Sequence, residues 1–141
     1  MKKLLISILL FSMSSISFAG SLSPANKATA TSALTDKTIT TISAATLDGK
    51  VISDSFTGYF GKDGKVTGKF VNKPADGPQS DQGSWNVKSD GKVCVTWEHW
   101  NEAKEKCVNF YKLNNAFLIL NKNNGFESLV LYSDMKSGNQ M

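Results

Sequence analysis

The chain has 141 residues and a formal net charge of +4, from 16 lysines against 12 acidic residues, with no arginine. This charge is too small to indicate a nucleic-acid or anionic-membrane partner. The guanidinium fork that binds phosphate and guanine in a bidentate way is missing altogether. Nucleic acid is therefore excluded as a partner, and the length suits one domain with a single hydrophobic core.

The N-terminus has the pattern of a secretory signal peptide. Two lysines precede an apolar run from Leu4 to Met13, and small residues surround a cleavage position between Ala19 and Gly20. The run is about ten residues, well short of the roughly 20 that a membrane-spanning helix needs. We therefore predict a signal peptide over residues 1–19 and a periplasmic or secreted mature protein without a transmembrane segment.

The segment after the predicted cleavage site is rich in serine and threonine. Residues 20–35 have few apolar side chains, so they are predicted to be a flexible leader. Thr35 and Asp36 have the side chains of a helix N-cap. The apolar residues that follow at helical spacing are Ile39, Ile42 and Ala45. A short helix is therefore predicted at the start of the folded domain.

From Gly49 onward, apolar and polar residues alternate between regularly spaced turns. The predicted strands are Val51–Phe60, Lys65–Val71, a strand around Trp85 and Val87, Lys92–Glu98, Lys106–Lys112, Ala116–Asn121 and Phe126–Tyr132. The Asp63-Gly64 pair suits the positive φ angles of a tight hairpin turn. About seven short strands in series predict a mainly β domain over residues 36–133, an antiparallel meander that forms a small barrel or a sandwich. Residues 134–141 are predicted to be a polar tail.

The two cysteines, Cys94 and Cys107, are predicted to form a disulfide. The signal peptide sends them to an oxidising compartment, and the Cys-x-x-Cys spacing of a metal or redox pair is absent. If the two residues lie opposite each other in a hairpin, one side of both strands is apolar throughout. The residues on that predicted core side are Val93, Val95, Trp97, Val108 and Phe110.

An ordered set of short motifs resembles a family of small exported bacterial proteins known as domain of unknown function 995. The motifs are Leu47–Val51, Gly58–Phe60, Asp63–Lys65, Gly68-Lys69, Gly83–Val87 and Asp90–Cys94, followed by Trp97 and Cys107. Together they cover roughly residues 36–112. The resemblance implies an exported β domain with a paired cysteine, and it implies no activity and no site residues.

His99 is the single histidine of the chain and lies beside Glu98 and Glu102. Such a group can bind a metal ion or act as a general base. A metal site needs three or four ligands in a fixed geometry, however, and no second histidine completes a catalytic triad. Acidic residues such as Asp63 and Asp90 occupy turn positions. We therefore predict no catalytic residue, no metal site and no cofactor.

The three tryptophans fall into two groups. Trp85 and Trp97 alternate with polar neighbours, which predicts core positions. Trp100 lies in the charged loop of residues 98–106. A loop tryptophan can be a stacking platform for a sugar or an anchor for a protein partner, or it can fold back over the end of a barrel. Trp100 and His99 are the predicted binding residues.

Three functions are compatible with these features. The first is an exported, non-enzymatic β module that binds an envelope component or a protein partner through the 98–106 loop. The second is a small periplasmic inhibitor of a hydrolase, which suits the size, the basic charge and the disulfide. The third is a hydrolase with an unrecognised carboxylate site. The sequence leaves the ligand or partner and the oligomeric state open.

Overall fold

The computed structural model describes residues 22–45, 48–49, 51–72, 74 and 77–141 of the chain. The predicted signal peptide and its cleavage site at Ala19 and Gly20 lie outside these residues. None of the helices in the described ranges combines the length and the apolar character that a bilayer crossing requires.

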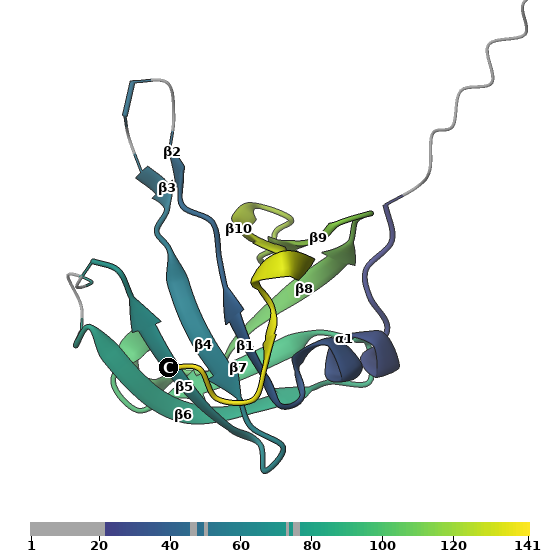
Figure 1. Ribbon diagram of the computed structural model, residues 1–141, viewed down its shortest axis with the longest axis horizontal. Helices are drawn as coiled ribbons and strands as arrows, with labels where there is room; N and C mark the ends of the chain where they lie inside the picture. The colour runs from purple at the N-terminus through teal and green to yellow at the C-terminus, as the bar shows by residue number, and fades with distance from the viewer. Residues whose placement is uncertain (1–21, 46–47, 50, 73, 75–76) are drawn as a thin grey trace, which may run out of the picture.

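The described part of the chain is mainly β, with one α-helix near its N-terminal side (Figure 1). The elements in chain order are α1 (Lys27–Leu34), β1 (Lys37–Thr40), β2 (Ala44–Ala45), β3 (Val51–Ser53), β4 (Phe56–Phe60), β5 (Lys65–Phe70), β6 (Ser80–Val87), β7 (Val93–Trp97), η1 (Trp100–Ala103), β8 (Lys106–Lys112), β9 (Ala116–Leu120), β10 (Phe126–Leu131), η2 (Tyr132–Asp134) and β11 (Lys136–Ser137).

Nine of these strands form one antiparallel sheet in the order β10-β9-β8-β7-β6-β5-β4-β1-β11, and β2 pairs with β3 in a separate hairpin. The sheet curls into a half-barrel (Figure 1). The amide of Ile42, just after β1, donates a 2.9 Å hydrogen bond to the carbonyl of Leu129 in β10, so strands from distant parts of the sheet meet. The predicted antiparallel meander is confirmed, as a single curled sheet and not as two packed sheets.

The positions of the helix and the leader were predicted wrongly. Helix α1 follows Asn26, whose side chain accepts a 2.9 Å hydrogen bond from the amide of Thr29. The helix therefore lies inside the segment predicted to be a flexible leader, and it ends just before Thr35, where the predicted helix begins. Residues 37–40 form strand β1 instead. Their β-branched side chains favour a strand, and this preference outweighs the helical spacing of the apolar residues.

Helix α1 covers one end of the half-barrel, which we call the closed end. Ala30 and Leu34 of the helix are fully buried there. The Trp85 ring lies 5.3 Å from that of Phe60, and its indole N–H donates a 3.0 Å hydrogen bond to the carbonyl of Gly61. Trp85 is therefore a core residue, as predicted. The other members of this core are Ala25, Ile39, Val66, Val93, Phe110, Phe117, Ile119 and Val130.

The C-terminal segment, predicted to be a polar tail outside the domain, is part of the sheet. Strand β11 pairs with β1, where Lys136 lies opposite Thr38. The Thr38 hydroxyl donates a 2.7 Å hydrogen bond to the carbonyl of Gly138 and accepts one of 2.9 Å from the amide of Gln140. Hydrogen bonds of the backbone hold this segment in the sheet. Its polar side chains do not indicate a strand, so the pairing was not predicted from the sequence.

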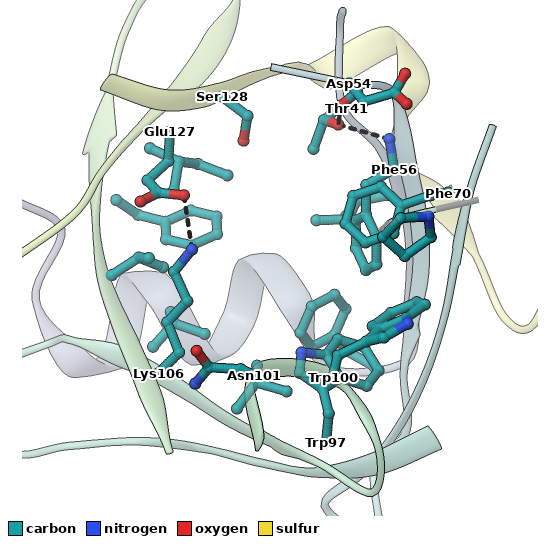
Figure 2. A pocket seen from close by; sticks show the side chains of 18 residues that line it. Thr41, Asp54, Phe56, Phe70, Trp97, Trp100, Asn101, Lys106, Glu127 and Ser128 are labelled. Atoms are coloured by element: carbon teal, nitrogen blue, oxygen red, sulfur yellow. Dashed lines mark hydrogen bonds and ion pairs between the residues drawn. The ribbon is translucent and has the colours of Figure 1, made fainter. Parts of the chain in front are cut away.

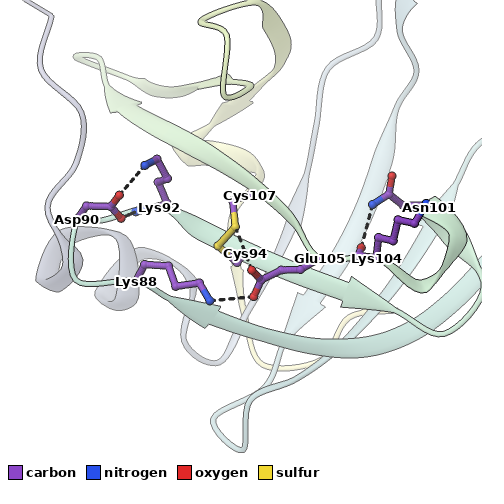
Figure 3. Close-up of a disulfide and its surroundings, with 8 residues drawn as sticks. All are labelled: Lys88, Asp90, Lys92, Cys94, Asn101, Lys104, Glu105 and Cys107. Carbon is purple, nitrogen blue, oxygen red and sulfur yellow. Dashed lines mark hydrogen bonds and ion pairs between the residues drawn. A yellow bond between two sulfur atoms is a disulfide. The ribbon is translucent and has the colours of Figure 1, made fainter.

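The disulfide joins Cys94 of β7 to Cys107 of β8, as predicted (Figure 3). The two cysteines lie directly opposite each other, and Val93 lies opposite Val108. Next to the disulfide, on the outer side of the sheet, Lys88 and Glu105 form a 2.9 Å ion pair. The residues predicted to share the inner side of this hairpin do so, and all of them face the interior: Val93, Val95, Trp97, Val108 and Phe110.

Candidate functional site

The end of the half-barrel opposite α1, which we call the open end, contains a cavity of about 430 Å³ (Figure 2). Its apolar floor, which packs with the core of the closed end, consists of Ile39, Phe60, Val93, Val95, Val108, Phe110 and Ile119. Its aromatic wall consists of Phe56, Phe70, Trp97 and Trp100, with Pro74 nearby. Its polar lining consists of Thr41, Asp54, Asn101, Lys106, Glu127 and Ser128.

The four rings of the aromatic wall pack against one another. The centroid of Phe56 lies 5.3 Å from that of Phe70, 5.9 Å from that of Trp97 and 6.3 Å from that of Trp100. Trp100 in turn lies 4.9 Å from Phe70 and 4.7 Å from Trp97. These tilted and edge-to-face arrangements are the ones that aromatic quadrupoles favour. The rings therefore hold one another in place and form one continuous surface.

Two glycines allow these rings to lie against the backbone. A Cβ atom at Gly68 would lie 2.6 Å from the rings of both Phe56 and Trp97, and one at Gly77 would lie 2.5 Å from the ring of Trp100. Such distances are well inside van der Waals contact, so any larger residue would push the rings away from the wall. Because the glycines give the rings this space, the interior between the rings and the opposite wall stays open.

Trp100 lies inside the molecule and not on its surface. The residue is only 5% exposed, and its indole N–H donates a 2.7 Å hydrogen bond to the carbonyl of Pro78. The sequence predicted that Trp100 and His99 form one contact surface, and the structure separates them. The His99 side chain is 65% exposed, whereas the ring of Trp100 lines the cavity. The loop thus folds back over the open end, which was the other possibility for a loop tryptophan.

Asp81, at the start of β6, holds the loop that carries Trp100. Its side chain is 1% exposed, and one carboxylate oxygen accepts 2.8 Å hydrogen bonds from the amides of both His99 and Trp100. The other oxygen contacts Nδ1 of His99 at 2.9 Å and accepts a bond of 2.9 Å from the amide of Gln82. Asp81 therefore ties β6 to the start of the loop through three contacts, and the fourth, with Gln82, lies within β6.

These contacts change the acid–base behaviour of both ionisable groups. Burial by itself raises the pKa of Asp81, but the hydrogen bonds from the His99 ring and from the amides of Trp100, His99 and Gln82 outweigh it and lower the pKa to about 2. The hydrogen bond to Asp81 and its negative charge raise the pKa of His99. Asp81 is thus a stable anion, and the loop is fastened to a fixed negative charge.

After Trp100 the chain makes a left-handed turn. Asn101, Glu102 and Ala103 have φ angles of 56°, 55° and 54°. A left-handed conformation costs a residue other than glycine roughly 1–2 kcal/mol, so such a turn persists only where its surroundings hold it. Asp81 anchors the chain before the turn, and the Asn101 side chain donates a 2.8 Å hydrogen bond to a backbone carbonyl after it. The strained turn borders the cavity through Trp100 and Asn101.

Polar groups lie across the cavity from the aromatic wall (Figure 2). Nζ of Lys106 and a carboxylate oxygen of Glu127 form an ion pair of 2.8 Å. Ser128 follows Glu127 in β10 and is 8% exposed, and its hydroxyl points into the cavity. No hydrogen bond joins this hydroxyl to the other lining residues drawn in Figure 2. The cavity thus combines an apolar floor, an aromatic wall and a side that carries both donors and acceptors.

The donor atoms of Asp81, Glu98 and His99 lie within 4.8 Å of one another, which is close enough to consider a metal ion. Asp81 and His99 are already bonded to each other, and both carboxylate oxygens of Glu98 accept hydrogen bonds from the Gln82 side chain, at 3.1 and 3.0 Å. This cluster therefore works as the support of the loop. A second group contains Cys94 and Cys107, whose sulfur atoms are joined in the disulfide.

Sequence reasoning missed most of the residues that form the cavity. One signal was available, because Lys106 alternates with Val108 and Phe110 and so falls on the core side of β8. A lysine on an apolar side indicates either the open end of a sheet or a buried ion pair. Asp81 and Ser128 gave no comparable signal, since their roles depend on strands that are distant in the sequence.

No protein-family model matches the chain, and no curated protein matches it in sequence. The resemblance to domain of unknown function 995 therefore stays a prediction made from the motifs themselves. The site is accordingly interpreted from its geometry and chemistry.

Proposed function

We propose that this protein is an exported, non-enzymatic binding module that holds a small molecule with an apolar body in the cavity at the open end. The observation that carries the proposal is the cavity itself. Its volume of about 430 Å³ falls within the roughly 300–1,000 Å³ of small-molecule sites, and it has the usual apolar lining with a few polar groups. The proposed location is the periplasm or the cell exterior, supported by the signal-peptide pattern and the disulfide.

The inward orientation of Trp100 favours a small ligand over a protein partner at the 98–106 loop. An anchor for a protein interface needs an accessible ring, and Trp100 is only 5% exposed. An envelope component remains a suitable source of the ligand, because an exported protein meets such molecules first. The inhibitor and hydrolase hypotheses stay predictions from the sequence, and no contact among the described residues favours either.

A fluorescent apolar probe tests this proposal directly. We expect the uncharged dye N-phenyl-1-naphthylamine to bind the mature protein saturably, with one site per chain and enhanced emission. Val95→Phe places a ring in the cavity, and Thr96→Phe is the matched control on the next residue of β7, which faces away from the interior. We expect at least about tenfold weaker binding for Val95→Phe and little change for Thr96→Phe, because only the first fills the site.

Two results would overturn the proposal. One is the absence of saturable dye binding to the wild-type protein. The other is equal weakening by both substitutions, which would place the dye outside the cavity. Circular dichroism and a thiol assay on each variant would check that the fold and the disulfide are intact.

A further inference from the structure

We infer that the ligand of this cavity is an uncharged amphiphile. Its apolar body lies against the floor and the aromatic wall, and its hydroxylated head lies at the side formed by Lys106, Glu127 and Ser128, which we call the polar side. This inference rests on the proposed function and adds the chemical class and the orientation of the ligand. It comes from three features of the cavity lining: a hydroxyl that faces the cavity, a neutralised ion pair and a third charged group that is held by hydrogen bonds.

Ser128 is the first feature. The residue is more than nine-tenths buried, its hydroxyl points into the cavity, and no hydrogen bond joins it to the other lining residues drawn in Figure 2. The hydroxyl oxygen borders the open cavity, so water pairs with it when the site is free, and a ligand that covers it must replace that hydrogen bond. A group on the ligand that donates or accepts a hydrogen bond would pair this hydroxyl. A purely apolar ligand would leave it unpaired.

The ion pair of Lys106 and Glu127 is the second feature. At 2.8 Å the ammonium and the carboxylate neutralise each other, so this side presents donors and an acceptor without an excess of either charge. An anionic head would approach Glu127 as well as Lys106, and a cationic head would approach Lys106 as well as Glu127. A charged head must therefore separate the pair or face repulsion. A hydroxylated head can donate to Glu127 and accept from Lys106 while the pair stays intact.

The third charged group at the cavity is Asp54. One carboxylate oxygen accepts a 2.8 Å hydrogen bond from the amide of Ser55, and the other accepts one of 3.0 Å from the Asn72 side chain. Thr41, beside it, is also engaged, because its hydroxyl accepts a 2.9 Å bond from the amide of Phe56. These hydrogen bonds hold Asp54 on the β1–β4 side of the opening, across the cavity from the ion pair (Figure 2), and its negative charge adds to the repulsion of an anionic head.

The orientation follows from the distribution of these groups. The floor carries only aliphatic and aromatic side chains and continues into the core of the closed end. The polar residues lie at the ends of strands where the half-barrel opens, Lys106 at the start of β8 and Ser128 near the start of β10. An apolar chain or ring therefore enters first, and the hydroxylated head stays at the opening.

Four compounds with the same eight-carbon chain and different heads test this inference. They are octyl glucoside, 1-octanol, octanoate and octylammonium, each used below its micelle concentration with the full-length mature protein. Isothermal titration and displacement of N-phenyl-1-naphthylamine give the affinities. We expect octyl glucoside to bind most tightly, and octanoate and octylammonium to bind at least about tenfold more weakly, because their charges meet a like charge in the pair.

Three substitutions on the polar side locate the effect. Ser128→Ala should weaken octyl glucoside by about threefold to tenfold, the effect of one hydrogen bond, and should leave octanol less affected. Glu127→Gln leaves the charge of Lys106 without its partner, so it should strengthen the binding of octanoate relative to that of octyl glucoside. Lys106→Gln should strengthen octylammonium in the same way. Lys92→Gln, on the outer surface beside Asp90, is a control that should change none of these ratios.

The outcomes separate the two proposals. If octanoate or octylammonium binds the wild-type protein as tightly as octyl glucoside, or if the polar-side variants leave the preferences unchanged, the inference about the head is wrong and the cavity proposal still holds. If none of the four compounds binds and the dye also fails to bind, the cavity proposal itself is wrong.

Discussion

The two ends of the half-barrel use the same residue type in opposite ways. At the closed end, Trp85 lies against Phe60 in a filled core, and its indole N–H binds the carbonyl of Gly61. At the open end, Trp100 is just as buried, and its indole N–H binds the carbonyl of Pro78, yet the space in front of it is empty. The difference is helix α1, which inserts Leu34 into one end and has no counterpart at the other among the described residues. Burial of a tryptophan therefore does not by itself distinguish a packed core from the wall of a binding cavity.

The largest effect should come from a paired truncation at the two ends. Leu34→Ala at the closed end should lower the free energy of unfolding by about 3 kcal/mol, because it removes methyl groups from a filled site. Val108→Ala at the open end should cost about 1 kcal/mol, because its side chain already borders empty space. Urea denaturation measures both values. Similar losses at both sites would show that the open end is packed as tightly as the closed end.

Loss of the disulfide should have an effect of about 3 kcal/mol, since it closes a loop with a sequence separation of 13. The Cys94→Ala/Cys107→Ala variant should also loosen the open end more than the closed end. In β8, residues 106–108 pair with β7 alone, whereas residues 109–112 pair with β9. Hydrogen exchange should therefore rise most at residues 106–108. A uniform rise along β8 would contradict this asymmetry.

A more moderate effect should come from acid. Asp81 has a pKa of about 2 in the folded protein against 3.8 for its ordinary value, so its ionised form stabilises the fold fully above about pH 4. This contribution, on the order of 2 kcal/mol, is lost as the pH falls through the folded pKa. Because Asp81 fastens the loop of Trp100, the tryptophan emission should shift to longer wavelength as acid opens the loop.

Two variants sharpen the acid prediction. Asp81→Asn keeps an acceptor oxygen and removes the titrating charge, so its stability should change less between pH 4 and pH 2 than that of the wild type. The pKa of His99 is raised by its contact with Asp81. The stabilisation from the charged His99 ring is therefore fully present below about pH 6.5 and is lost as the pH rises through the pKa of His99 in the folded protein. NMR titration of the His99 ring should show the raised pKa and should return to the ordinary value in Asp81→Asn.

Local sequence patterns predicted most of the strands and failed at one edge of the sheet, where β1 and β11 lie side by side. The strand predicted over residues 106–112 begins and ends at the same residues as β8. Its apolar and polar residues alternate over its whole length, and clear turn residues follow it. In the predicted turn at Asp63-Gly64, Gly64 has a positive φ angle of 78°, whereas Asp63 does not have one. Strand β1 was missed because its apolar residues continue at helical spacing. Strand β11 was missed because it is short and polar and pairs with β1, about 100 residues away in the sequence.

The sequence by itself determined the meander, the inner and outer sides of its strands and the cysteine pairing, because alternation and turn residues act over a few neighbouring positions. The tertiary structure alone decided that α1 fills one end, that the rings of Trp97 and Trp100 lie back on glycines at the other, and that Asp81 anchors the loop between them. These features depend on the curl of the whole sheet, which brings together side chains from strands far apart in the chain. The cavity is therefore a property of the whole curled sheet and not of any one segment.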